Sequence, residues 1–535
     1  MVEKIETLLL LLGLVGLLAV AAERLKFPFP ILLVIAGLLI AMVPRLPSIH
    51  LDSDLVLVVF LPPLLFSAAW NFPWEEFRAN LMPIFGLAVV LVFATMTAVA
   101  FTAVWLVPGM TMATAFVLGA IVSPPDAVAA TSIFHKLRVP RRLVTVLEGE
   151  SLVNDSSGLV AYQFAVAAVV TGSFSFAQAS GEFVWMSVGG ILFGWLIGII
   201  AARLHRRIGE PAVEITLTIL TPYAAYLGAE QFGFSGVLAC VAAGLHVGHR
   251  AWEALSPESR LQRDAIWKFI DYLLNGIVFI LIGLQFPTII EQLEYFTLWQ
   301  AVAIGAIISC VVILVRFALV GPTIWLERLV FRHSRRQEAP LKPAAIVVAS
   351  WAGMRGVVSL AAALALPTLT HSGAAFPHRH LIIFITFSVI FTTLVLQGLT
   401  LPFLVRILKV EESSSDYQSE ADTRVAVFEE LICEIDRQIA QKTDTRAVQA
   451  LEFWRGNYAE RISHLKDRLG WIEDNNSEEL QEQKYFPILM NHARRYIAQM
   501  RARGEISEQM RRRIEYDFDL EEQRIARIIQ HHPKS

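Results

Sequence analysis

The sequence predicts an all-α integral membrane protein of about thirteen transmembrane helices, followed by a cytoplasmic helical tail. Hydrophobic residues make up 55% of the 535-residue chain. Charged residues make up only 17%, against roughly 25% in soluble domains. Charges are sparse up to about Val410 and dense from Glu411 onward. These observations divide the chain into a membrane domain, 1–410, and a hydrophilic tail, 411–535.

Mostly apolar runs long enough to cross a bilayer as helices recur through the membrane domain. The first run follows Glu3, Lys4 and Glu6, so it lacks the positively charged leading region of a signal peptide and is interpreted as a transmembrane helix. The alternating pattern of a β-barrel strand does not appear. We expect spans at 6–22, 29–44, 54–70, 81–107, 111–134, 143–170, 183–203, 213–231, 235–248, 265–286, 298–326, 343–367 and 380–408.

Lys and Arg concentrate in alternate loops between these spans, as they do in loops that face the cytoplasm. One such loop contains Arg138, Arg141 and Arg142, and another contains Arg335 and Arg336. This bias predicts a multi-pass protein of the cell (inner) membrane, with the N-terminus outside and the tail in the cytoplasm.

Two spans contain residues that interrupt a helix. The fifth reads VLGAIVSPPDAVAATSIF, in which Pro124 and Pro125 remove two amide donors. The twelfth reads VVASWAGMRGVVSLAA, in which Gly353 and Gly356 weaken the helix. They hold corresponding positions in spans 1–6 and 8–13, which favours an inverted repeat. Such a pair of interrupted helices indicates the substrate site of a transporter.

Ionisable residues inside spans are costly and are therefore candidates for function. They are Asp126 in the fifth span, Glu150 and Asp155 in the sixth, Arg316 in the eleventh and Arg355 in the twelfth, with Asp271 in the tenth as a weaker candidate. Arg316 is expected to pair with Glu150, because neither charge is stable alone in a medium of low dielectric constant. Arg355 is expected to balance carbonyl dipoles where the interrupted helices end.

The sixth span, VLEGESLVNDSSGLVAY, places Ser151 and Asp155 on one helix face, with Asn154 on the adjacent face. Carboxylate, hydroxyl, amide and freed carbonyl oxygens are ligands for a small, hard cation. We therefore expect a monovalent cation at Asp126 and Asp155, with further ligands from Ser151, Asn154 and carbonyls near Pro124. Burial disfavours a charged carboxylate, so a proton can compete with the cation, and this competition is sufficient for exchange. Asp155 is the better candidate for the group that titrates, and Asp126 for one that shapes the coordination shell.

Four segments, FLPPLLFSAAW, SPPDAVAATSIF, EGESLVNDSSGLV and WAGMRGVVSLAAALALP, resemble the signature segments of the monovalent cation/proton antiporters. The resemblance is to the first branch of that family, which includes bacterial sodium/proton antiporters and animal sodium/proton exchangers, and it covers roughly residues 5–410. It implies a homodimer in which a core domain with two crossed, discontinuous helices moves past a dimerisation domain in an elevator-like way. It also implies ion binding at Asp155 and Asp126 with Asn154 and Ser151, and electroneutral exchange because position 154 is Asn.

The chain departs from the family pattern at two places. Many members carry an acid directly after the Leu-Pro-Pro motif of the third span, where this chain has Ser67. The prolines of the fifth span precede Asp126, whereas the more usual order puts a proline after the aspartate. Both places concern ion coordination, so the choice among sodium, potassium and lithium stays open.

Other function classes fit less well. A regulated cation channel needs no proton counterflow, and an intramembrane enzyme with Asp126 and Asp155 as a carboxylate dyad needs no helix break. We expect a transporter rather than an enzyme, with no cofactor. The expected partners are sodium or another monovalent cation, protons, the lipid bilayer and a second copy of the chain. The net charge of −3 gives no indication of nucleic-acid binding, and the three cysteines suggest neither disulfides nor a metal cluster.

The tail has the pattern of amphipathic helices. Apolar residues recur at helical spacing at Phe428, Leu431, Ile432, Ile435 and Ile439, and again around Ile514, Phe518 and Ile525. Both a solvated helical appendage and a regulatory or dimerising module agree with this pattern.

Overall fold

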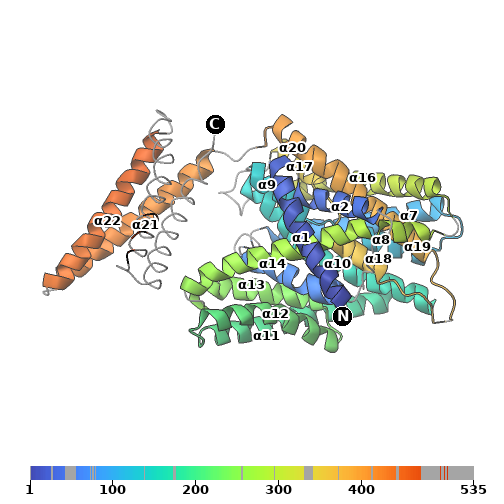
Figure 1. Ribbon diagram of the computed structural model, residues 1–535, viewed down its shortest axis with the longest axis horizontal. Helices are drawn as coiled ribbons and strands as arrows, with labels where there is room; N and C mark the ends of the chain where they lie inside the picture. The colour runs from blue at the N-terminus through green and yellow to red at the C-terminus, as the bar shows by residue number, and fades with distance from the viewer. Residues whose placement is uncertain are drawn as a thin grey trace. The chain divides into compact units, whose positions relative to one another are not determined.

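The computed structural model contains helices and, within the residues that it describes, no β-strand beyond an isolated pairing of Leu369 with Ala375 (Figure 1). The predicted all-α fold is therefore confirmed. Contacts divide the chain into two compact units, Met1–Glu412 and Ser413–Ser535. The structure describes residues 2–25, 28–42, 56–72, 74, 78, 80–137, 139–172, 176–254, 257–293, 296–330, 342–371, 373–410, 414–441, 445–471, 495, 499 and 503.

The helices of the first unit form two bundles. The first, which we call the α4 bundle, consists of α1 (Val2–Leu25), α2 (Phe29–Ala41), η1 (Val56–Phe60), α4 (Leu61–Asn71), α11 (Phe176–His205), α12 (Pro211–Gln231), α13 (Gly236–Ala254) and α14 (Pro257–Leu284). In it α2 packs against α14, and α13 packs against both α4 and α11. Prolines in the first turns of α2, α4 and α12 occupy positions whose amides have no partner within the helix.

The second bundle, the α10 bundle, consists of α6 (Leu81–Phe85), η2 (Gly86–Val90), α7 (Leu91–Leu106), α8 (Met112–Val122), α9 (Val128–Leu137), α10 (Arg141–Thr171), α16 (Leu298–Val330), α17 (Pro343–Trp351), α18 (Val357–Leu364), α19 (Arg379–Thr392), η3 (Thr393–Gln397) and α20 (Gly398–Ile407). Helix α15 (Phe286–Glu291) follows α14 and contacts both bundles. Figure 1 shows α11–α13 on one side of the unit and α7, α16 and α20 on the other.

Both predicted helix interruptions are present in the α10 bundle. Residues 123–127 separate α8 from α9 and include Pro124 and Pro125. Residues 352–356 separate α17 from α18 and include the two glycines of the twelfth span. Helix α10, by contrast, continues unbroken through its polar motif.

Small residues let helices of the α4 bundle approach closely. A Cβ atom added at Gly283 of α14 would lie 2.6 Å from the Leu38 amide nitrogen of α2. One added at Gly244 of α13 would lie 2.7 Å from Ala69 Cβ of α4. Such contacts are typical of helices that associate within a bilayer.

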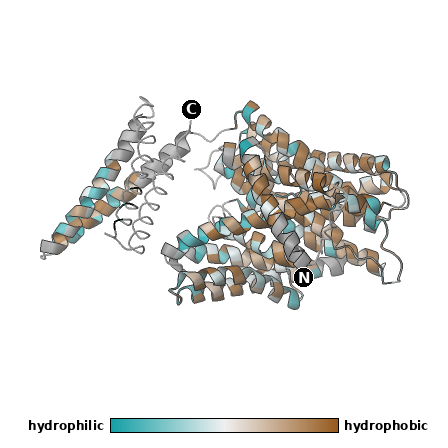
Figure 2. Cartoon of the chain, in the orientation of Figure 1, coloured by the Kyte–Doolittle hydropathy of each residue, from teal (hydrophilic) through white to brown (hydrophobic). Residues whose placement is uncertain are grey.

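Hydrophobic residues predominate along the helices of the first unit, as Figure 2 shows. Trp105 and Trp299 are both 83% exposed, which suits contact with lipid. Six helical stretches of the described chain are long and apolar enough to cross a membrane: Gly86–Leu106, Gly181–His205, Pro211–Gln231, Gln262–Glu291, Leu298–Ile324 and Arg379–Ile407. Helix occupies each of the expected span ranges, and the total of thirteen crossings stays a prediction.

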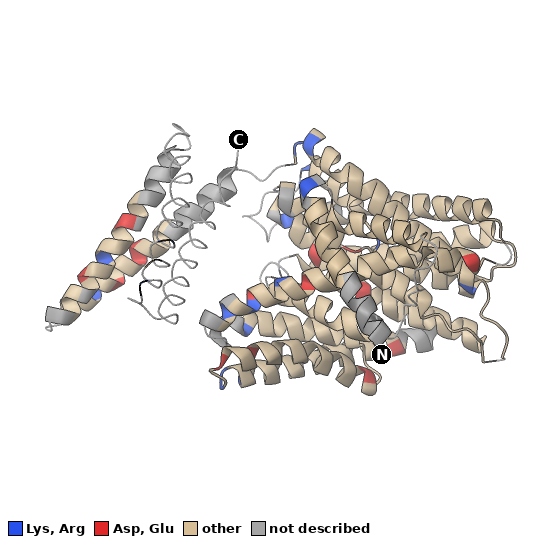
Figure 3. Ribbon diagram, in the orientation of Figure 1, with Lys and Arg blue, Asp and Glu red and all other residues tan. Residues whose placement is uncertain are grey.

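The second unit contains α21 (Ser414–Gln441) and α22 (Thr445–Trp471), which pack against each other. Phe428 lies against Tyr458 with ring centroids 5.6 Å apart, and Arg455 bonds Asp436 at 2.8 Å. Figure 3 shows charged residues frequent on these two helices and sparse in the first unit. The later apolar positions around Ile514, Phe518 and Ile525 lie outside the described residues.

Candidate functional site

The two helix interruptions meet in space. The Asp126 backbone amide, in the break between α8 and α9, donates a hydrogen bond to the Met354 carbonyl, in the break between α17 and α18, at 2.7 Å. Gly356 lies so close to Asp126 that an added Cβ atom would overlap the aspartate side chain. The two discontinuous helices therefore touch at their breaks, and the ends of four half-helices converge there.

The carboxyl group of Asp126 lies at the N-terminal ends of two half-helices. Its Oδ1 accepts a hydrogen bond from the Val128 amide, in the first turn of α9, at 2.8 Å. Its carboxylate also accepts one from the Val357 amide at the start of α18. Helix N-termini carry unpaired amides and a partial positive charge, so both ends stabilise the carboxylate.

The positive charge of Arg355 lies at the two opposite ends. Its Nε donates to the Val122 carbonyl at 3.0 Å and its Nη2 to the Ser123 carbonyl at 3.3 Å, where α8 ends. Its Nη1 donates to the Gly353 carbonyl, just beyond α17. The side chain is 1% exposed. Arg355 thus balances carbonyls that the interruptions leave without helical partners.

Helix α10 contributes polar side chains to the same region. Ser151 Oγ accepts a hydrogen bond from the Ala127 amide at 3.3 Å. Asn154 Nδ2 donates to the Pro125 carbonyl at 3.0 Å. Asn154 is fully buried, and its Oδ1 has no hydrogen-bond partner in the described structure. A buried amide oxygen without a donor is available to a cation.

The Asp155 carboxylate differs from that of Asp126. Asp155 is half-buried, and its carboxylate accepts no hydrogen bond from the described residues. It lies close enough to Asp126 for the two negative charges to interact. Asp126 is therefore fixed by backbone amides, whereas Asp155 keeps its oxygen atoms free for a ligand.

The expected ion pair between Glu150 and Arg316 joins α10 to α16. Arg316 Nη1 and Nη2 contact Glu150 Oε1 and Oε2 at 2.5 and 2.9 Å, a bidentate arrangement. Arg316 Nε and Nη2 also donate to the Ala349 carbonyl of α17, each at 3.3 Å. Both charged side chains are 1% exposed, so each requires the other for its burial.

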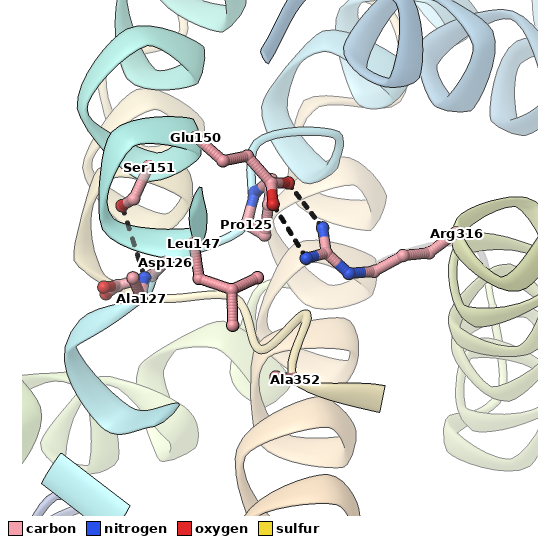
Figure 4. A pocket seen from close by; sticks show the side chains of 8 residues that line it. All are labelled: Pro125, Asp126, Ala127, Leu147, Glu150, Ser151, Arg316 and Ala352. Carbon is pink, nitrogen blue, oxygen red and sulfur yellow. Dashed lines mark hydrogen bonds and ion pairs between the residues drawn. The ribbon is translucent and has the colours of Figure 1, made fainter. Parts of the chain in front are cut away.

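A small pocket lies between this ion pair and the break in the fifth span (Figure 4). Its space is about that of a single water molecule. In Figure 4 the Asp126 carboxylate points away from the Glu150–Arg316 pair, and Ser151 approaches the Ala127 amide from α10. The pocket is lined by Pro125, Asp126, Ala127, Leu147, Glu150, Ser151, Arg316 and Ala352.

Three carbonyls near Pro124 that we expected to face a cation already accept protein donors. The Val122 and Ser123 carbonyls bond Arg355, and the Pro125 carbonyl bonds Asn154. Side-chain oxygens are consequently the more accessible ligands in this structure.

The sequence reasoning also missed a contact of Ser67. Its hydroxyl donates to Asp271 of α14 at 2.6 Å. In the sequence, the one feature that pointed to this contact was the ionisable side chain of Asp271 within an apolar span.

We expect Gly356→Ala to reduce cation-dependent exchange by about tenfold or more, since the new methyl group must displace the Asp126 carboxylate from the α18 amide. The measurement is the initial rate of cation-driven proton movement in proteoliposomes. Gly321→Ala is the matched control, because nothing lies within 4 Å of a Cβ atom added there in α16. Equal rates for the two variants would contradict the close approach at Gly356.

Comparison with known families gives one match that covers most of the chain. Residues 8–407 match the family described as sodium/hydrogen exchanger, transmembrane.

Comparison with known proteins agrees. A protein of Escherichia coli named "Uncharacterized Na(+)/H(+) exchanger YjcE" is 32% identical over 96% of this chain and 97% of its own length. A protein of Bacillus pumilus named "Sodium, potassium, lithium and rubidium/H(+) antiporter" is 36% identical over 74% of this chain and 60% of its own length. In fold, the chain is similar to the sodium proton antiporter MjNhaP1 from Methanocaldococcus jannaschii, with a TM-score of 0.59 and 19% identity over 76% of this chain and 99% of that one.

Proposed function

Because this chain belongs to the sodium/hydrogen exchanger family, we propose that it exchanges a monovalent cation for a proton across the membrane. The proposed cation is sodium, with potassium and lithium as alternatives. It is a multi-pass membrane protein, and its named relatives are exchangers or antiporters. The relative from Bacillus pumilus carries sodium, potassium, lithium and rubidium in its name, so all four cations belong in the test below.

One observation carries the proposal: the Asp155 carboxylate, beside the meeting point of two broken helices, has no hydrogen-bond donor among the described residues. A half-buried carboxylate in that position requires a cation or a proton as its partner. The two ligands compete for it, and this competition couples their movement in opposite directions. Ser151, Asn154 and Asp126 complete the proposed cation site.

The same geometry supports exchange of one cation for one proton. The Asp126 carboxyl group already accepts hydrogen bonds from the amides of Val128 and Val357, which hold it in place. The side chain of Asn154, next to Asp155, carries no charge to exchange. A single carboxylate then alternates between cation and proton, so the cycle moves no net charge.

Alternating access is proposed to arise from movement of the α10 bundle past the α4 bundle. The α10 bundle contains both broken helices and every proposed ligand, so the whole site moves as one body. The α4 bundle is proposed to hold two copies of the chain together as a homodimer. The proposed location is the cell inner membrane, with the N-terminus outside. Residues 411–535 would form the cytoplasmic tail beyond the transport domain, 1–410.

The test is a proteoliposome assay with an imposed proton gradient, to which sodium, lithium, potassium or rubidium is added in turn. We expect at least one cation to collapse the gradient without generating a membrane current. If none of them does so, the exchange proposal fails. A cation current without proton counterflow would instead identify a channel.

A further inference from the structure

A second acid lies inside the membrane unit and outside the site described above. Asp271 of α14 accepts a hydrogen bond from Ser67 Oγ of α4 at 2.6 Å. Ser67 is 3% exposed. Both helices belong to the α4 bundle, and α14 also contacts α18 while α4 contacts α10.

Within the described part of the chain, only one oxygen of this carboxylate has a hydrogen-bond donor. Asp271 Oδ1 is buried and accepts no hydrogen bond from the residues that the structure describes. Arg263 acts on Asp271 electrostatically, but its guanidinium is engaged elsewhere. It donates to Asn71 Oδ1 at 3.3 Å, bonds Asp264, and lies 4.5 Å from the centre of the Trp70 ring.

A buried carboxylate oxygen without a partner is costly, especially inside a membrane unit. Ser67 donates its only hydroxyl proton to Asp271 and keeps its oxygen lone pairs. The pair thus presents a carboxylate oxygen and a hydroxyl oxygen as hydrogen-bond acceptors. The one hydroxyl proton of Ser67 is already used in the hydrogen bond between them. Oxygen atoms of these two kinds are ligands of hard cations.

We propose that Asp271 and Ser67 form a second binding site for a monovalent cation, separate from Asp126 and Asp155. The proposal rests on the proposed function only for the class of its ligand. In this arrangement a cation is held between α4 and α14, both of the α4 bundle. Nothing in the exchange mechanism above uses Asp271, so its occupancy can be measured independently of transport.

The experiment measures binding in detergent-purified protein whose exchange site is disabled by Asp155→Asn. The midpoint of thermal unfolding is followed as sodium chloride replaces choline chloride, because a cation that binds only the folded protein raises the midpoint. We expect the sodium-dependent rise to persist in Asp155→Asn and to disappear when Asp271→Asn is added. Adding Ser67→Ala should raise the sodium concentration for half-maximal effect about three- to tenfold, since one ligand is lost.

Glu291→Gln is the control, because Glu291 is an exposed acid at the end of α15 and its replacement should leave the sodium effect unchanged. The proposal is overturned if Asp155→Asn shows no sodium effect, or if the effect survives Asp271→Asn. Should the Asp271→Asn double variant fail to elute as a folded protein, Ser67→Ala decides: an unchanged sodium dependence overturns the site. Exchange by the wild-type protein is a separate measurement, so a failed second site and a failed exchange function give different results.

Discussion

Asp155→Asn is expected to abolish cation-driven proton movement in proteoliposomes while leaving the protein folded. The asparagine side chain has almost the same size and cannot exchange a proton for a cation. Because the Asp155 carboxylate has no hydrogen-bond donor among the described residues, its neutral replacement removes a half-buried charge and no stabilising contact. The unfolding midpoint should therefore be equal to that of the wild-type protein or higher. Exchange rates and thermal unfolding are measured on the same preparations.

Asp264→Asn is the matched control for this experiment. It makes the same chemical change on an acid of α14 whose side chain is 53% exposed, where ion pairs contribute little. Exchange should continue in that variant. Exchange by Asp155→Asn at the wild-type rate would place the transported ion at another group.

Glu150→Ala should cause the largest loss of stability among single substitutions in the α10 bundle. It leaves the buried guanidinium of Arg316 without its bidentate partner. Breaking a buried pair from one side costs about 3–5 kcal/mol in the free energy of unfolding, because the remaining charge stays desolvated. The expected result is a markedly lower unfolding midpoint in detergent and a lower yield of folded protein.

Replacing Glu150 and Arg316 together distinguishes two causes of lost stability. One is the burial of a single unpaired charge, and the other is the loss of the ion pair itself. The double variant Glu150→Leu with Arg316→Met replaces both charges by apolar side chains, and such replacements are often neutral or stabilising. We expect it to recover most of the stability that Glu150→Ala loses. A Glu150→Ala protein that unfolds at the wild-type temperature would contradict a structural role for the pair.

The helical architecture could be predicted from composition and from local breakers of helices. Apolar runs located the helices, and Pro124, Pro125, Gly353 and Gly356 located the two interruptions, because prolines and glycines act on their own backbone. The π-helical turns η1, η2 and η3 were not predicted. Their apolar residues are the same as those of the helices around them, so composition contains no signal for them.

Contacts between distant segments were predictable only where charge required them. Arg316 and Glu150 both needed a partner, so their pairing could be expected from the sequence, and its role stays a proposal. The hydrogen bond between Ser67 and Asp271 joins residues 204 positions apart and has no local pattern. The partners of Asp126 are likewise amides at the starts of α9 and α18, which depend on how the two broken helices cross.

The position of Arg316 also has a mechanical consequence. From α16 it holds Glu150 of α10 and the Ala349 carbonyl of α17 at the same time. If α10 rotated or slid relative to α16 and α17, the charges of Glu150 and Arg316 would be separated while both remained buried in an apolar interior. The guanidinium therefore couples α10 to α16 and α17, so that α10 cannot shift alone. Any displacement large enough to expose Asp155 to the other side of the membrane must move α16 and α17 together with α10.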